Sequence, residues 1–425
     1  MGLIHLPSSC KKSPMSDQEK PWKHLLRGLG INLLVCIGSV SIFLGGTELV
    51  ARIWYTPQKY EYTGMFEYDK EKVFGLRKNI DDIYRGGHFT TNSFGFRGRE
   101  TSVEKPPKTL RVLMVGDSVT FGHGMDNEQT FSSLLEAALN KHFSDEGKGD
   151  STVEVVNTAV PGNAPFQEYH DLKRGLQFNP DAIVLQVTLN DIIEPHAKWI
   201  LEDMGIYEGN LEIISHDYVL GIANISQIDH VLKQYSAFYL FLKDMQTRIR
   251  FRDPTGKHVR EKAYRKENYT SALLVTEPEN PTAVKAWENA LGWIRGMTST
   301  AQERNIPIVL LVTPYDFQFS VEESFAYPQQ KLRGFATEEK LYFADILQKL
   351  WELLAEHAGK EKTADQIILE EQAKGAKSTM LSDFWTEYFS DYCHPTATGH
   401  ILIAEELYPL VLEALTASQA KENNE

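Results

Sequence analysis

Residues 110–124 read LRVLMVGDSVTFGHG, and this stretch decides the fold. Its first part, Leu110–Val115, is a short apolar run that predicts a buried strand, and Gly116 ends the run. A helical pattern of apolar residues follows over 130–143. A strand that leads through a glycine turn to a helix is the first unit of an α/β fold. It leaves Ser118 just beyond the end of the strand.

The same alternation of strand and helix patterns continues along the chain. We expect strands at 153–157, 182–188 and 308–313, and helices at 165–176, 282–304, 338–357 and 398–417. Strands that alternate with helices form a parallel sheet with helices on both faces. The sequence therefore predicts a three-layer α/β/α sandwich around a central parallel sheet.

The composition excludes several classes of protein. With 42% hydrophobic and 24% charged residues in 425, the chain resembles a globular protein rather than a polytopic membrane protein or a disordered one. A net charge of -14 disfavours binding to nucleic acid, which requires a concentrated basic surface. Of three cysteines, only Cys393 falls in the globular body, so we expect neither a disulfide nor a thiolate metal site there. We expect no cofactor or metal.

Residues 29–50 form an apolar stretch without Lys or Arg, about 33 Å long as a helix at ~1.5 Å per residue. Such a helix is long enough to span a membrane as an uncleaved signal anchor. The alternatives are a buried core helix, because Glu48 and several glycines interrupt the stretch, and a removed signal peptide. The basic residues before it predict a cytoplasmic segment 1–28 and an extracytoplasmic body, periplasmic in a bacterium; they are Lys11, Lys12, Lys20, Lys23 and Arg27.

The rest of the chain divides by pattern. Residues 51–108 lack sustained periodicity and predict an extended lead-in that includes TNSFGFRG at 91–98, followed by the main domain at 109–417 and a disordered tail at 418–425. Residues 192–281 form a long insertion rich in aromatic residues, with a basic cluster. It is either a cap over the substrate, contributing Trp199 and Tyr207, or a set of helices packed on an aromatic mini-core with a solvated basic face.

Three residues at the two ends of the main domain suit nucleophilic catalysis. Ser118 follows the first strand, and Asp391 and His394 stand in DYCHP directly before the last helix. A serine hydroxyl becomes a good nucleophile when an imidazole removes its proton and a carboxylate fixes that imidazole. Each motif alone is more often a turn or a helix start, so the prediction rests on their joint placement at one edge of the sheet.

Two further positions suit an oxyanion hole. Gly162 follows the second expected strand, and Asn190 follows the third at the same sheet edge as Ser118. A glycine N–H and a side-chain amide there can point at one oxygen beside the serine. A turn glycine and a helix cap are the alternatives.

These motifs resemble those of the SGNH/GDSL hydrolases. VLMVGDSVTFGHG is similar to the family's first block, in which Ser118 would be the nucleophile and first oxyanion donor. VVNTAVPGNA and VTLNDI are similar to the second and third, which would give the same hole the N–H of Gly162 and the amide of Asn190. DYCHPTATGHILIAEEL is similar to the last, with Asp391 and His394 completing the triad. The resemblance implies a flavodoxin-like fold with about five parallel strands.

One residue departs from the family pattern. Thr188 stands where the third block usually has glycine, which bears on pocket shape rather than on the donor itself. The lead-in behind an N-terminal anchor is similar to bacterial members associated with cell-envelope or exported polysaccharides.

The resemblance implies an esterase that removes acyl groups, such as acetyl, from a carbohydrate. An O-acyltransferase with the same triad and a catalytically silent binding protein are the alternatives. His123, close to Ser118, is a candidate for the substrate pocket, although a structural or exposed histidine is the commoner case. Cys393 is a poor candidate for a catalytic thiol, and His400 is expected to be structural.

Overall fold

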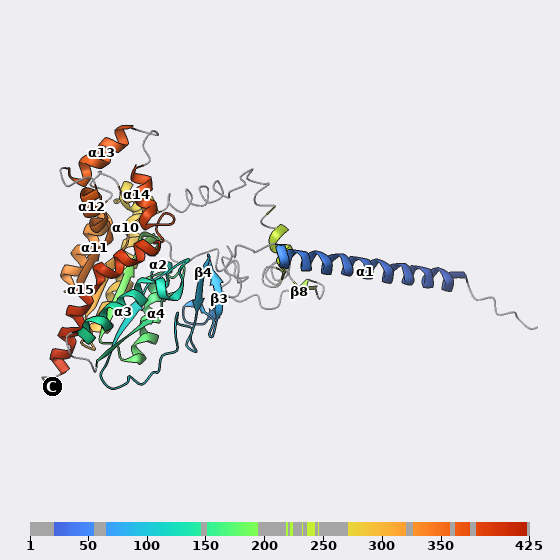
Figure 1. Cartoon of the computed structure of the whole chain (residues 1–425), viewed down its shortest axis with the longest axis horizontal. Coiled ribbons are helices and arrows are strands. Elements are labelled where there is room, and N and C mark those ends of the chain that lie inside the picture. The colour runs from blue at the N-terminus through green and yellow to red at the C-terminus, as the bar shows by residue number, and fades with distance from the viewer. Residues whose placement is uncertain are drawn as a thin grey trace, which may run out of the picture. The chain divides into compact units, whose positions relative to one another are not determined.

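The computed structural model describes residues 21–54, 65–145, 151–193, 218–219, 222–223, 232, 236–242, 245, 271–319, 326–357, 362–374 and 380–422. The chain divides into two compact units. The first contains helix α1 (Pro21–Trp54) together with Ser236–Leu242, and the second contains the α/β domain (Figure 1).

The central sheet has five parallel strands in the order β11-β10-β7-β5-β6. Their bounds are β5 Thr109–Val115, β6 Thr152–Asn157, β7 Ala182–Val187, β10 Ile308–Val312 and β11 Tyr342–Asp345. Every residue of β5, β7 and β10 is buried, as expected for strands covered on both faces. The predicted parallel α/β architecture is therefore confirmed.

Alternate residues of the strands fill two separate cores. Val112 and Met114 of β5 pack with helices α3, α12 and α15, whereas Leu113 and Val115 pack with α4, α10 and α11. The helices of the first face are α3 (Phe131–Asp145), α12 (Ile346–His357) and α15 (Ala397–Glu422). Those of the second are α4 (Pro165–Gly175), α10 (Pro281–Gln302) and α11 (Tyr327–Glu338).

Shorter elements complete the domain. Helices α13 (Ala364–Lys374) and α14 (Met380–Tyr388) pack beside α12 and α15 (Figure 1). The remaining elements are α2 (Ser118–Phe121), α5 (Leu189–Ile193), η1 (Asn127–Gln129), η2 (Leu176–Phe178), η3 (Asp316–Gln318), β8 (Tyr218–Val219) and β9 (Ile222–Ala223).

Two expectations near the C-terminal end were wrong. The helix expected at 338–357 is instead the end of α11, strand β11 and helix α12. Strand β11 runs straight into α12 with no turn residue between Asp345 and Ile346, so its apolar residues merged with the helical pattern. The tail expected to be disordered from Ser418 continues α15 as far as Glu422. Ala, Gln, Lys and Glu dominate that segment and favour helix.

The lead-in forms two hairpins that the sequence did not predict. Strands β1 (Phe66–Asp69) and β2 (Val73–Leu76) pair antiparallel, as do β3 (Asp81–Tyr84) and β4 (Gly87–Thr90). Phe74, Tyr84 and Phe89 from these strands form a small core with Phe121 of α2 and Val160. The lead-in thus packs against the segment that follows Ser118.

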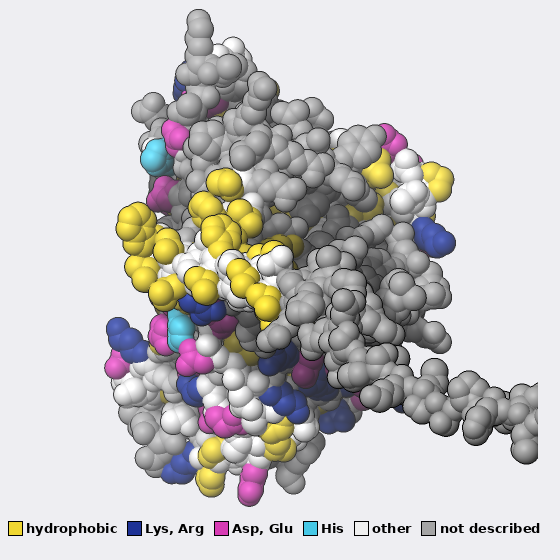
Figure 2. All heavy atoms as spheres, turned by 90° about the vertical axis from the view of Figure 1, so that its right-hand side faces the viewer, with side chains coloured by type: hydrophobic (Ala, Val, Ile, Leu, Met, Phe, Trp, Pro, Cys, Tyr) yellow, Lys and Arg dark blue, Asp and Glu magenta, His cyan; other side chains and the backbone are white. Residues whose placement is uncertain are grey.

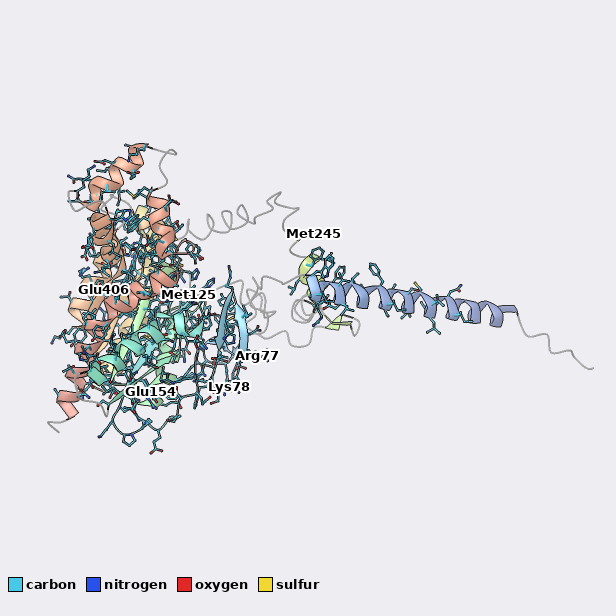
Figure 3. The ribbon with its side chains drawn as sticks, in the orientation of Figure 1. Arg77, Lys78, Met125, Glu154, Met245 and Glu406 are labelled. Atoms are coloured by element: carbon cyan, nitrogen blue, oxygen red, sulfur yellow. The ribbon has the colours of Figure 1, made fainter. Side chains whose placement is uncertain are left out.

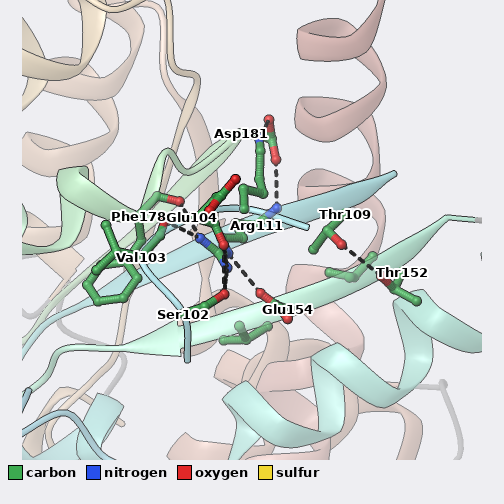
Figure 4. A network of polar contacts seen from close by, with 12 residues as sticks. Ser102, Val103, Glu104, Thr109, Arg111, Thr152, Glu154, Phe178 and Asp181 are labelled. Carbon is green, nitrogen blue, oxygen red and sulfur yellow. Dashed lines mark hydrogen bonds and ion pairs between the residues drawn. The ribbon is translucent and has the colours of Figure 1, made fainter. Parts of the chain in front are cut away.

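A buried arginine ties the amino-terminal ends of the strands together (Figure 4). Arg111 of β5 is fully buried, and its guanidinium donates to Glu154 of β6 at 2.8 Å and to the carbonyl of Phe178 at 2.9 Å. Its backbone N–H donates to Asp181 at 2.6 Å, directly before β7. This network lies at the opposite end of β5 from Ser118, so we assign it to stability.

Helix α1 is the one described helix long and apolar enough to cross a membrane, although a signal sequence would meet the same criteria. The span Gly30–Trp54 has a mean hydropathy of 2.0, and its most apolar 18 residues are not buried. Many of the exposed large hydrophobic residues belong to it, and Figure 2 shows hydrophobic side chains gathered in one area of the visible face.

Candidate active site

A glycine shapes the loop after β5. A Cβ at Gly116 would lie 2.5 Å from Thr120 Oγ1 and 2.7 Å from Gln186 Oε1, inside any allowed contact. The close approach lets Gln186 of β7 accept from the Thr120 hydroxyl at 3.0 Å. Asp117 then caps α2 by accepting the Val119 N–H at 2.9 Å, so Ser118 begins the helix.

The structure brings the three predicted triad residues together. Ser118 Oγ lies 2.9 Å from His394 Nε2, and His394 Nδ1 lies 2.7 Å from Asp391 Oδ2. The other oxygen of Asp391 accepts the N–H groups of Cys393 at 3.0 Å and His394 at 2.9 Å. With its Nδ1–H donated to Asp391, His394 presents Nε2 as an acceptor for the serine proton.

The groups around Asp391 favour its negatively charged form. Burial by itself would raise the pKa of the Asp391 carboxyl, but the positive charge and hydrogen bond of His394 and the Cys393 N–H hold this pKa below its usual range. These contacts therefore favour the ionised form of Asp391 at neutral pH. An ionised carboxylate stabilises the imidazolium that forms when His394 takes a proton.

The three predicted oxyanion donors follow three adjacent strands. Ser118 comes after β5, Gly162 after β6 and Asn190 after β7, and these strands are neighbours in the order β6-β5-β7. Gly162 has a φ of 79°, a left-handed conformation that glycine adopts without strain.

A residue of the GDS motif fixes the side-chain amide among these donors. Asn190 Nδ2 donates to Asp117 Oδ2 at 2.9 Å. This bond orients the Asn190 amide and leaves its second N–H for a ligand.

A second buried carboxyl lies near Asp117. Glu168 of α4 is fully buried, and neither of its oxygens has a hydrogen-bond partner. Burial first, and then the charges of Asp117 and Asp171, raise the pKa of Glu168 well above its usual value. The environment of Glu168 therefore favours its neutral, protonated form.

His123 stacks on the imidazole of the triad. The rings of His123 and His394 have centroids 3.8 Å apart and planes inclined by 17°. The hydroxyl of Tyr84, on β3 of the lead-in, lies 3.0 Å from His123 Nδ1. Burial, together with the positive charge of His394, lowers the pKa of His123 well below its usual value, so His123 is neutral.

An arginine of TNSFGFRG holds the loop that carries His123. Arg97 is buried and donates to the carbonyls of Phe121, Gly122 and Met125, the last labelled in Figure 3. Its Nε also donates to Asn127 Oδ1 at 3.2 Å. These bonds satisfy carbonyls at the end of α2 that have no helical partner. The turn-dense motif was visible in the sequence, but its target was not.

The same cluster contains residue types that bind metal ions. Among the described residues, His123, Asp391 and His394 offer potential ligand atoms within 4.8 Å of one another. Both ring nitrogens of His394 already contact Ser118 and Asp391. The lone pairs of two stacked rings lie in nearly parallel planes and do not converge on one ion. The arrangement therefore suits a base better than a metal.

The other residues considered from the sequence do not belong to the hydrogen-bonded triad. Cys393 is buried in the core of the second face, and His400 is fully buried, with its Nδ1 accepting the N–H of Phe131 at 3.0 Å. Burial lowers the pKa of His400 to about 3, which fits a structural histidine. Trp199 and Tyr207 lie outside the described residues, as does most of the insertion.

Asp316 is a site residue that the sequence did not suggest. It begins η3 after β10, and its N–H donates to the carbonyl of Tyr392 at 2.9 Å. Burial, and after it the charge of Asp391, raises the pKa of Asp316 to about 7, although the Phe317 N–H opposes this shift. No motif marks Asp316, and only the folded chain brings it near the triad.

The fold and the serine site together define an ester hydrolase of the α/β class. A family model described as GDSL-like lipase/acylhydrolase matches residues 112–407, and the chain belongs to this family. No match was found among the curated proteins.

Solved structures similar to the chain include three esterases. An acetyl xylan esterase, AlAXEase, is 12% identical with a TM-score of 0.34, covering 71% of this chain and 98% of its own. A catalytic mutant of Axe2, an acetylxylan esterase from Geobacillus stearothermophilus, is 12% identical with a TM-score of 0.35, covering 73% and 96%. The psychrotrophic esterase EstA from Pseudoalteromonas sp., inhibited by monoethylphosphonate, is 12% identical with a TM-score of 0.31, covering 72% and 98%.

Proposed function

We propose that this protein cleaves acyl esters through a covalent intermediate on Ser118, with His394 as base and Asp391 as the residue that orients it. The continuous chain of hydrogen bonds from Ser118 Oγ through His394 to Asp391, 2.9 Å and then 2.7 Å long, carries the proposal. These are the contacts that proton removal from a serine hydroxyl requires.

The proposed reaction has two steps. His394 Nε2 takes the Ser118 proton as Oγ attacks the ester carbonyl, and the N–H groups of Ser118 and Gly162 and the Asn190 amide bind the oxyanion. The protonated His394 then gives its proton to the departing alcohol, which leaves an acyl-serine. Water, deprotonated by His394, releases the acid and restores the serine.

We propose a small acyl group, such as acetyl, carried by a carbohydrate. The low exposure of Ser118 and His394, at 8% and 7%, supports a small acyl group because a long chain needs a wide approach. The resemblance of the lead-in to members associated with exported polysaccharides supports a carbohydrate. Substrate contacts from the insertion, through Trp199 and Tyr207, and from His123 beside Ser118 remain part of this proposal.

We also propose that α1 anchors the protein, with the hydrolase domain on the extracytoplasmic side. The apolar span Gly30–Trp54 and the basic residues before it support this topology. Protease added to spheroplasts should then degrade the domain. A domain that stays intact until the membrane is permeabilised would contradict the topology.

Hydrolysis of an aryl acetate by the purified full chain tests the function. Ser118→Ala should abolish turnover, whereas Ser133→Ala, which removes a half-buried hydroxyl of α3, should retain it. Full activity in Ser118→Ala would refute the nucleophile. With an acetylated oligosaccharide and a free one together, acetate in solution supports an esterase, and acetyl groups on the second sugar indicate the transferase alternative.

A further inference from the structure

A carboxylate of the membrane-spanning candidate helix binds a segment of the distant insertion. Glu48 Oε2 accepts from the Ser236 hydroxyl at 2.7 Å and from the Phe238 N–H at 3.1 Å. Glu48 Oε1 accepts from the Ala237 N–H at 3.0 Å and from Arg52 Nε at 2.8 Å. Residues 237–242 are helical, so Glu48 caps the first turn of this helix from another part of the chain.

This contact explains an acidic residue in an apolar helix. A carboxylate is costly at the centre of a bilayer. At ~1.5 Å per residue, Glu48 lies about 27 Å along α1 from Gly30. A hydrocarbon core of about 30 Å that begins near Gly30 would therefore end beside Glu48. Glu48 is thus placed at the rim of the membrane, on the side from which the chain continues to the hydrolase domain.

The capped segment, residues 236–242, has the composition of protein segments that lie at a membrane surface. Residues 236–242 read SAFYLFL, which is apolar on every side after the first residue. Phe241 and Leu242 are 37% and 40% exposed, and the other residues of the segment are half-buried. A helical surface that is apolar on every side is not stable in water alone, whereas aromatic residues are enriched where lipid meets water. Ser236–Leu242 groups with α1, rather than with the α/β domain, as one compact unit.

We propose that Ser236–Leu242 lies in the membrane–water interface, docked on the domain-side end of α1 through Glu48. The exposed side chains of Phe241 and Leu242 then insert into the lipid bilayer. The insertion then attaches to the membrane at a point that depends on α1. Removal of α1 as a signal peptide would leave the first turn of this helix uncapped, so the inference requires that α1 stays in the mature chain. It does not depend on the esterase activity.

Fluorescence quenching in vesicles tests this proposal with the full chain. In a background without the three native cysteines, an environment-sensitive label is attached at Phe241→Cys or at Leu369→Cys, an exposed position of α13. Phospholipids with a quencher on the acyl chain should remove roughly half or more of the emission at 241 and little at 369. Equal, weak quenching at both positions would overturn the membrane location.

A second variant tests the role of Glu48. Glu48→Ala should reduce quenching at 241 at least about twofold because the helix loses its cap and its attachment. The matched control is Thr47→Ala, which removes a hydroxyl that bonds only within α1, to Leu44 O at 2.9 Å. Quenching at 241 that is the same in both variants would overturn docking through Glu48.

Discussion

His123 and His394 lie face to face, with ring centroids 3.8 Å apart, and Nε2 of His394 lies 2.9 Å from Ser118 Oγ. Tyr84 fixes His123 from the other side through its hydroxyl, 3.0 Å from Nδ1. A residue of the lead-in thus holds a neutral ring against the proposed base. Such packing limits the rotation of His394 and keeps Nε2 aimed at the serine.

Loss of this ring should lower the turnover rate. His123→Ala removes the stacked surface, and we expect kcat to fall roughly tenfold because His394 becomes less well oriented. His123→Phe restores an aromatic face and should recover much of the loss. The pH–rate profile should keep its shape in both variants because His123 is neutral. Disappearance of one limb of the profile would instead identify His123 as an acid or base.

Removal of the Asn190 amide should destabilise the transition state of the reaction. Asn190→Ala is expected to lower kcat by roughly 10² to 10³ and to leave KM nearly unchanged. Asn140→Ala removes an amide that bonds the backbone of Val153 at the start of β6, and it should leave kcat intact. No change in kcat for Asn190→Ala, or loss of folding alone, would contradict the assignment.

Arg97 should contribute strongly to stability. Arg97→Ala removes the side-chain donor to three carbonyls at or after the end of α2, of which Gly122 O keeps the N–H of Met125, and we expect the free energy of unfolding to fall by roughly 3 kcal/mol. The neighbouring Arg99 is exposed and pairs only with Glu136, so Arg99→Ala should have little effect. Denaturant titration of the two variants measures the difference. Equal effects would show that Arg97 is not the support of this loop.

Asp316 should make stability depend on pH. Its pKa rises from 3.8 to about 7 on folding, so between these values the unfolded chain loses a proton that the folded chain keeps. The free energy of unfolding therefore falls as the pH rises through this window. Asp316→Asn removes this cost. It should raise the free energy of unfolding by up to ~4 kcal/mol more at pH 8 than at pH 4, and solvent screening of the partly exposed carboxyl reduces this difference. Asp365→Asn, at an exposed position of α13, should show no such difference.

The local pattern was enough to predict most of the sheet. Strands β5, β7 and β10 are largely apolar runs, with Arg111 in β5 and Gln186 in β7 as the charged or amide exceptions, and four of the five strands were expected within a residue or two. Strand β11 was missed because it passes directly into α12. A short strand with no turn residues at its end cannot be told by its apolar pattern from the helix that follows it. The hairpins of the lead-in were missed because their strands have four residues each.

The candidate site was predictable where a motif carries the chemistry. Residue type and position, after the first strand for Ser118 and before the last helix for Asp391 and His394, predicted the triad, and the folded chain brings the three within hydrogen-bonding distance. The supporting contacts of Tyr84 and Arg97 join segments that only the tertiary structure brings together. Residue type alone does not reveal such partners.

Covalent labelling of the full chain tests the central claim most directly. A p-nitrophenyl alkylphosphonate should transfer one phosphonyl group to the chain with release of nitrophenol, and peptide mass spectrometry should locate the group on Ser118. His394→Ala should slow the labelling by orders of magnitude because no base removes the serine proton. We predict a single adduct on Ser118 that forms in parallel with the loss of esterase activity. An adduct on another residue, or full inhibition with Ser118 unmodified, would contradict the account.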